Sequence, residues 1–226
     1  MTDNPDAVAA ILKNLSYLKD AGAQALQDLA AIVTLRDLKA GEQIIHDGDA
    51  GEEAYLVISG VLVVKKKLED GRDKLIALIG PGSIAGEMAL LTRDPRSADV
   101  YAHIDSKVAV LNKKAFDLFR GSGPHIADKL LRDMTRRQRG AINRLRDANW
   151  MLLPTRLAIT LGDLGRDFGM HENNAVRITL PLTSTDLADL AVCTSNEAAM
   201  LLTEWDMSGF IKKDGDLITL LKPEEF

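Results

Sequence analysis

Short apolar runs separated by glycine occupy residues 32 to about 112, and this pattern limits the fold more than any other feature of the chain. The runs include YLVISG, VLVVKKK and KLIALIGPG. The glycines between the runs are Gly48, Gly60, Gly71 and Gly80. Turns use such glycines for positive φ or tight packing. The Asp70-Gly71 pair in LEDGRD is typical of a hairpin turn. Many short strands at this spacing predict an antiparallel roll, sandwich or barrel.

Helical spacing appears on both sides of this region. Apolar residues from Val8 to Leu18 recur at steps of three and four, which predicts a helix from 8 to about 30. A long helix is predicted from Pro124, with an apolar heptad seam. The seam consists of Leu131, Met134, Gln138, Ala141, Leu145, Ala148 and Leu152. It favours contact between two copies of the chain, and the alternative is packing on the chain's own sheet.

Arginines flank this seam, and they are interpreted as solvated positions rather than as a nucleic-acid patch. They are Arg132, Arg136, Arg137, Arg139, Arg144 and Arg146. Pro154 interrupts the helix, and a second helix is predicted from about Thr155 to Phe168, followed by a loop at GMHENNA. The remaining segment has the pattern strand, helix, turn, helix, hairpin, with a capping box at Thr194 and Glu197 and a turn at Asp214-Gly215. This order predicts a winged helix-turn-helix.

Composition excludes several classes of protein. The net charge is −5 over 226 residues, so the total charge does not indicate nucleic acid. No apolar run or signal-peptide pattern indicates a membrane or secretion, and Cys193 is the only cysteine, so a cytoplasmic location is expected. The histidines lie far apart, and no metal site is expected. They are His46, His103, His125 and His171. No nucleophile–base pair is evident, so an enzyme is not expected.

The stretch GEMALLTRDPRSADV, residues 86–100, carries the chemistry of a small-molecule site. Gly86 allows close approach of a ligand, and a short helix after it would present free N–H groups to an anion. Arg96 offers a planar fork of donors for phosphate, and Ser97 adds a hydroxyl. Glu87 would repel phosphate and suits a sugar hydroxyl. Together they suit a nucleotide whose phosphate lies beside its ribose; the alternative is a surface loop closed by a Glu87–Arg96 salt bridge.

This stretch resembles the phosphate-binding cassette of cyclic nucleotide-binding domains, with Gly86-Glu87-Met88-Ala89-Leu90 followed by Arg96-Ser97-Ala98. Residues AGEQIIHDGDAGEEAYLVISGVLVV upstream resemble the start of that domain's β-roll. The C-terminal half is similar to the winged helix of the cAMP receptor protein/FNR superfamily of bacterial transcription regulators. The resemblance implies an α+β chain with a β-roll domain (1–123), a dimerisation helix (124–153) and a winged helix-turn-helix (154–226).

The resemblance also implies site roles, which we state as expectations. Glu87 binds ribose hydroxyl, while Arg96 and Ser97 hold the cyclic phosphate of cAMP or cGMP. Main-chain groups of Gly86, Met88 and Ala89 assist. The long helix forms a homodimer and closes over the base, so that ligand reorients two DNA-binding winged helices. Double-stranded promoter DNA and RNA polymerase are the further partners that the family implies.

Two departures from the family pattern concern the base and the DNA. The adenine-reading Thr-Ser pair of the cAMP receptor is replaced by Ala141 and Ile142, so Gln138 and Asn143 are candidates for contacting the base. Gln138 can alternatively fix the helix register. The predicted recognition helix contains no Arg or Lys. The expected DNA contacts are Thr194, Ser195, Asn196, Lys212 and Lys213.

From Pro154 to the end there are six basic and twelve acidic residues, a balance of the wrong sign for a DNA-binding surface. Asn196 can also serve only as part of the helix start. These two features favour the alternative below, but the order of elements along the whole chain favours a cyclic nucleotide-gated, dimeric transcription regulator, which is the leading hypothesis. The alternative is a cyclic nucleotide-binding effector whose acidic winged helix contacts proteins.

Overall fold

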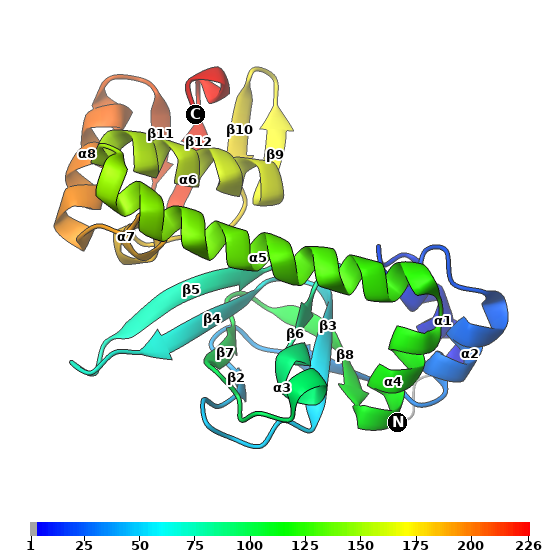
Figure 1. Ribbon diagram of the computed structural model, residues 1–226. Coiled ribbons are helices and arrows are strands. Elements are labelled where there is room, and N and C mark those ends of the chain that lie inside the picture. The colour runs from blue at the N-terminus through cyan, green and yellow to red at the C-terminus, as the bar shows by residue number, and fades with distance from the viewer. Residues whose placement is uncertain (1–3) are drawn as a thin grey trace. The chain divides into compact units, whose positions relative to one another are not determined.

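The computed structural model describes residues 4–226, and the chain divides into two compact units (Figure 1). The first contains the described residues up to Asp73 together with Ala77–Arg137, and the second contains Lys74–Ile76 and Gln138–Phe226. The division falls inside helix α5 (Pro124–Trp150), after Arg137. It lies there, rather than at the ends of the predicted dimer helix, because Ile126 and Leu130 in the first turns belong to the core of the first unit.

Two four-stranded sheets form the body of the first unit. The order in one sheet is β1 (Thr34–Leu38), β8 (Ser106–Asn112), β3 (Glu53–Ser59) and β6 (Ile84–Ala85). The order in the other is β2 (Gln43–Ile45), β7 (Asp99–Ala102), β4 (Leu62–Lys67) and β5 (Asp73–Ile79). Antiparallel pairing joins neighbours in both sheets, for example Tyr55 with Val110 and Val64 with Val100. The predicted antiparallel β-roll is confirmed.

Strand β3 shows why this region contains continuous apolar runs rather than alternating apolar and polar residues. Its central residues Tyr55, Leu56 and Val57 are all buried, because one face meets the other sheet and the opposite face meets helices. Val57 packs in the core between the sheets, and Leu56 packs in the core beneath the helices. The predicted hairpin turn between β4 and β5 is confirmed, with Gly71 at φ 84°.

The helices of the first unit are α1 (Pro5–Lys13), α2 (Ala23–Ala30), α3 (Glu87–Thr92), α4 (Lys113–Gly121) and the first part of α5. Figure 1 shows α1, α2 and α4 gathered together. The predicted single helix over 8–30 is wrong, because α1 ends at Lys13 and α2 begins after Gly22. Tyr17 and Leu18 lie in the segment that connects the two helices, and both are completely buried.

The second unit contains the rest of α5, three further helices and one sheet (Figure 1). The helices are α6 (Leu153–Phe168), α7 (Ser184–Ala191) and α8 (Ser195–Met207), with a final 3₁₀ turn at Pro223–Glu225. The sheet order is β11 (Ile211–Asp214), β12 (Leu217–Leu220), β10 (Ala175–Ile178) and β9 (Gly169–Glu172). The predicted order of helix, turn, helix and hairpin is confirmed.

Local chemistry explains some of these boundaries. Thr194 and Glu197 form the predicted capping box at the start of α8, and Thr183 and Asp186 form a second one at α7. The predicted loop at GMHENNA is wrong, because β9 pairs with β10 across a turn in which Asn173 has φ 56°. Asparagine tolerates this left-handed conformation, so it can replace glycine in such a turn.

None of the helices among residues 4–226 is both long and apolar enough to cross a bilayer.

Candidate ligand site around helix α3

The cassette residues 86–98 form a short helix and a return loop on the edge of the first sheet. Strand β6 pairs with β3 and ends at Ala85, and the next residue, Gly86, turns the chain into α3 with a φ of 79°. The predicted short helix is confirmed as α3, which ends at Arg93 in the same left-handed conformation. The loop then returns towards β7, and Arg96 N–H donates to the carbonyl of Asp49 at 2.8 Å. The backbone therefore holds both ends of the cassette.

Two glycines make room for the guanidinium of Arg96. A Cβ atom on Gly86 would lie 2.6 Å from Nη1 of Arg96, and one on Gly51 would lie 3.1 Å from its Cζ. The Gly51 position would also place a Cβ 2.1 Å from that of Ala89. Side chains at these two positions would displace Arg96 or α3, so the tight geometry requires glycine.

Arg96 is only 9% exposed, and its partners are main-chain carbonyls. Nη1 donates to the oxygen of Gly86 at 2.7 Å, and Nη2 donates to the oxygen of Glu53 at 2.6 Å. A guanidinium has five N–H donors and stays charged, so these two bonds fix its plane without neutralising it. A buried cation held in this way attracts an anion, and its fork suits phosphate oxygens.

Glu87 is 3% exposed and lies at the first position of α3. Its Oε1 accepts a hydrogen bond from Nη1 of Arg137 at 3.1 Å, and Nη2 of Arg137 donates to the carbonyl of Ile84 at 2.7 Å. Burial raises the pKa of the Glu87 carboxyl, and the charge of Arg137 opposes that rise. The alternative of a Glu87–Arg96 salt bridge is wrong, because each side chain has different partners.

Arg137 is a residue of the candidate site that the sequence pattern missed. It was grouped with the solvated arginines that flank the seam, but it is partly buried against Glu87. One turn earlier on α5, Asp133 is 7% exposed and accepts a hydrogen bond from the hydroxyl of Tyr17 at 2.5 Å. The sequence of charged residues along α5 does not by itself distinguish the buried Asp133 and the partly buried Arg137 from the exposed arginines of the same helix.

The other predicted ligand residues divide between the two units. Ser97 is exposed, and its carbonyl accepts a hydrogen bond from Nζ of Lys66, a further cation beside the cassette. Met88 is 50% exposed, and Ala89 is buried. The candidate base contacts lie on the part of α5 that belongs to the second unit. They are Gln138, Ala141, Ile142 and Asn143.

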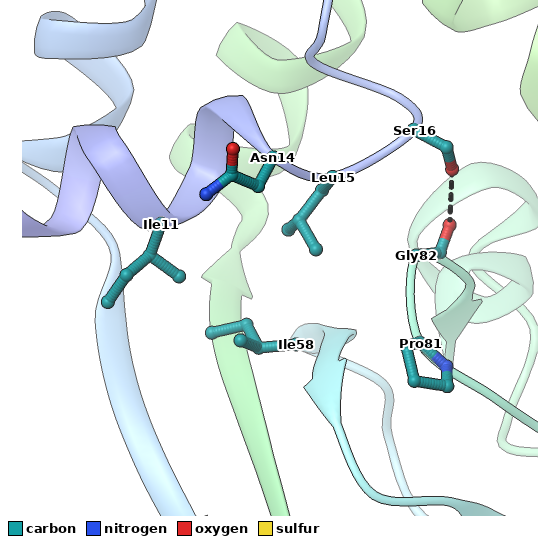
Figure 2. Close-up of a pocket in the computed structure, with 7 residues that line it drawn as sticks. All are labelled: Ile11, Asn14, Leu15, Ser16, Ile58, Pro81 and Gly82. Carbon is teal, nitrogen blue, oxygen red and sulfur yellow. Dashed lines mark hydrogen bonds between the residues drawn. The ribbon is translucent and has the colours of Figure 1, made fainter.

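At least two hollows lie on the described surface of the first unit. One, of about 760 Å³, adjoins the cassette and is lined in part by Gly51, Glu53, Ala89 and Lys113. The other, of about 460 Å³, lies beside the end of α1 (Figure 2), where Ser16 donates a hydrogen bond to the carbonyl of Gly82 at 3.2 Å. The lining drawn in Figure 2 contains no charged side chain. It therefore does not suit phosphate, and the cassette remains the candidate site.

The predicted dimer residues are largely exposed along α5. Leu131 is 65% exposed and Leu145 is 66% exposed, while Met134, Ala141 and Ala148 are partly buried. Leu152 is 78% exposed, but it lies between α5 and α6 as the N-cap of α6. It therefore does not extend the seam of α5 itself.

The predicted DNA-contact residues lie on two neighbouring elements of the second unit. Thr194 caps α8, whose first two residues are Ser195 and Asn196. Lys212 is exposed and Lys213 partly buried on β11, which contacts α8. Of the five predicted DNA contacts, the two cations therefore lie on β11, and neither lies on α8.

Comparison with known proteins gives a consistent family context. Residues 35–120 match the model of the cyclic nucleotide-binding domain. The chain is 26% identical over 220 residues to the CRP-like cAMP-activated global transcriptional regulator of Mycobacterium tuberculosis, covering 97% of this chain and 90% of that protein. It is 38% identical over 110 residues to a cAMP-dependent protein kinase regulatory subunit of Yarrowia lipolytica, covering 49% of this chain and 28% of that one.

A solved structure shares the fold across almost its full length. The c-di-GMP-responsive global regulator CLP of Xanthomonas campestris matches with a TM-score of 0.73 and 20% identity, covering 88% of this chain and 99% of that one. At this identity the match supports the arrangement of elements. Ligand and partner assignments depend on the cassette and on the chemistry of α8.

Proposed function

Because this chain belongs to the cAMP receptor protein/FNR superfamily of transcription regulators, we propose that it is a dimer whose DNA binding responds to a cyclic nucleotide. The β-roll takes the nucleotide, α5 joins two copies and the winged helix binds DNA. The proposal assigns the chain no catalytic activity. The observation that carries it is the buried guanidinium of Arg96, which has carbonyl partners and no carboxylate partner among the described residues.

The cassette suits a ribose and its cyclic phosphate better than either group alone. The phosphate takes the donors of Arg96, the hydroxyl of Ser97 and main-chain N–H groups at the start of α3. The ribose hydroxyl donates to Glu87, which lies at the same end of that helix. The family match over residues 35–120 and the cAMP-activated relative support this assignment.

Arg137 provides the connection from ligand to α5. It holds the carboxylate that we assign to the ribose, so a bound hydroxyl must share Glu87 with Arg137 or replace it. Either change alters how α5 is held at this turn. Nucleotide binding thereby shifts the equilibrium between two arrangements of the dimer helix.

The side chains that select the base differ from the Thr-Ser pair that reads adenine in the cAMP receptor. Ala141 and Ile142 have no side-chain hydrogen-bonding group, and Gln138 and Asn143 are the nearby residues that do. We therefore expect the nucleotide to bind mainly through its ribose phosphate. The expected discrimination between cAMP and cGMP is small or depends on Gln138.

The test is calorimetry of the full chain with cAMP, cGMP and cyclic di-GMP, the last because a structural relative responds to it. We expect saturable binding of a cyclic mononucleotide. Removing a charged hydrogen-bonding partner costs about 1.5–3 kcal/mol, so Arg96→Ala should weaken binding by about tenfold or more. Arg96→Lys keeps the charge but not the fork, and it should also bind less tightly.

Arg36→Ala is the matched control, because Arg36 is a surface arginine paired with Glu42 away from the cassette. It should bind nucleotide like the original chain. Thermal unfolding of each variant checks that it is folded. Undiminished binding by folded Arg96→Ala would rule out the cassette as the site.

The second candidate function is a nucleotide-binding effector whose winged helix contacts proteins. The observation in its favour is the acidic winged helix, with six basic residues against twelve acidic ones and no cation on α8. Binding to random genomic DNA separates the two functions, because DNA affinity falls steeply with salt. Absence of DNA binding at low salt with saturating cAMP or cGMP would favour the effector.

A further inference from the structure

The outward face of α8 presents an amide, a hydroxyl and two thioethers, and it carries no cation. Four of its exposed residues, Asn196, Met200, Thr203 and Met207, follow the i, i+4, i+7, i+11 spacing of one helix face. The exposed carboxylates Glu197, Glu204 and Asp206 flank this face. Met200 is 73% exposed and Met207 is 85% exposed, whereas Ala198 and Leu202 on the opposite face are fully buried. As the second helix of a helix-turn-helix, α8 would place its first turns against base edges in a major groove.

The polar groups of the first turn are not equally available. The carboxylate of Glu197 accepts hydrogen bonds from the N–H and hydroxyl of Thr194, and these bonds lower the pKa of Glu197. The hydroxyl of Ser195 lies 2.7 Å from that of Thr185. Among the described residues, no protein group bonds to the side-chain amide of Asn196. Asn196 is therefore the polar group of this turn that can give both a donor and an acceptor to a base.

The available groups match one kind of base pair. An Asn amide pairs with N6 and N7 of adenine, and apolar groups contact the methyl of thymine. Guanine is read most often by Arg or Lys, which α8 lacks. Cytosine is read by a carboxylate, and the one in this turn is engaged at the helix cap.

We propose that α8 reads A·T base pairs, with Asn196 bonding to adenine and Met200 contacting the methyl group of thymine. This inference rests on the proposed DNA-binding function and assigns the sequence class that the winged helix selects. Thr203, one turn beyond Met200, presents a further methyl to the same groove.

Phosphate contacts would come mainly from the wing. Lys212 is exposed on β11, while the N–H of Lys213 is fixed by Asp206 at 2.9 Å. If these two lysines in each subunit neutralise about four phosphates per dimer, log K should fall with log salt with a slope of about −4. The electrostatic contribution to the free energy of DNA binding is then modest, and base contacts from α8 add to it.

The experiment selects duplexes from a random-sequence library with the full chain and saturating cAMP or, in parallel, cGMP. Fluorescence anisotropy then measures affinity for the selected duplex and for one with the read A·T pairs changed to G·C. We expect selection of A·T pairs and at least about tenfold weaker binding after the change. Asn196→Ala should remove most of this discrimination, and Asn196→Gln should retain it, because Gln also pairs with adenine.

Met200→Arg gives the opposite test, since it should shift selection towards G·C pairs. Met207→Ala, at the far end of the same face, is the control and should leave the preference unchanged. Selection of G·C pairs by the original chain, or an unchanged preference in folded Asn196→Ala, would overturn the inference while leaving DNA binding intact. Failure to bind any duplex at low salt would overturn the proposed function and this inference with it.

Discussion

At the residue scale, Arg96 and Glu87 are held in different ways, and the difference agrees with the separate roles that we propose for them. Arg96 is fixed by carbonyls and retains its full charge. Glu87 is buried against the cation of Arg137, and the partner that we propose for it in the ligand is a neutral hydroxyl. Burial of this carboxylate is costly, since its pKa is raised despite the nearby guanidinium.

Glu87→Gln should therefore stabilise the ligand-free chain and weaken ligand binding. In the folded state the raised pKa means that Glu87 binds a proton more readily than in the unfolded state. Its contribution to the free energy of unfolding accordingly falls as pH rises from the ordinary carboxyl value through the raised one. Thermal unfolding should show that Glu87→Gln is more stable than the original chain at neutral pH. The difference in stability should be smaller at lower pH.

Calorimetry on the same variant should show nucleotide affinity reduced by about 1 kcal/mol, or about fivefold, because a neutral acceptor replaces a charged one. Glu69→Gln, in the exposed turn between β4 and β5, is the control. It should change neither the thermal stability nor the nucleotide affinity. A less stable Glu87→Gln at neutral pH would contradict the account of this site.

At the element scale, the first turns of α5 are joined to the first unit by two successive polar contacts. Asp133 accepts the hydroxyl of Tyr17, and one turn later Arg137 reaches Glu87. Tyr17 packs edge-on against Phe119 with ring centroids 5.5 Å apart, and its hydroxyl is the only polar atom of a fully buried side chain. These contacts fix the rotation of α5 about its axis, and they place Arg137 towards α3.

Tyr17→Phe should reduce the free energy of unfolding by about 1.5–3 kcal/mol, because it removes a hydrogen bond to a buried carboxylate. Chemical denaturation measures the change. Tyr101→Phe is the matched control, since Tyr101 is a partly exposed tyrosine on β7, and it should lie within about 0.5 kcal/mol of the original chain. A change below that limit for Tyr17→Phe would show that the Tyr17–Asp133 contact does not hold α5.

At the scale of the whole molecule, the proposed dimer explains the exposed apolar residues of α5. Leu131, Ile142 and Leu145 are each more than half exposed. Burying a leucine side chain contributes about 1.5–3 kcal/mol, so several such residues from each copy can hold two chains together. The arginines between them keep the rest of the helix hydrated.

Leu145→Glu should convert the dimer into a monomer, because it places two like charges opposite each other in the seam. Sedimentation analysis measures the state. Met170→Glu, which changes an exposed apolar residue on β9, is the control and should leave the dimer intact. A Leu145→Glu protein that sediments as a dimer would exclude the α5 seam as the interface.

The sequence predicted the β-roll, the helix-turn-helix and the cassette because each depends on local chemistry: glycine turns, a Thr-x-x-Glu cap and a Gly-Glu start of a helix. It did not predict the break after α1 or the strand β9. Those features depend on packing, since Tyr17 must be buried beside Phe119 and Gly169–Glu172 pairs with a strand that follows it. The pairing of Arg137 with Glu87 joins residues 50 positions apart, and the local pattern of α5 contains no sign of it.

The most direct test of the central claim is the affinity for the selected duplex, measured by anisotropy as cAMP or cGMP is titrated. If nucleotide at the cassette controls the winged helix, DNA affinity should change by at least about fivefold, and DNA should change nucleotide affinity by the same factor. Arg96→Ala should show neither change at these concentrations. Equal DNA affinity with and without nucleotide, in a chain that calorimetry shows to be saturated, would contradict the account.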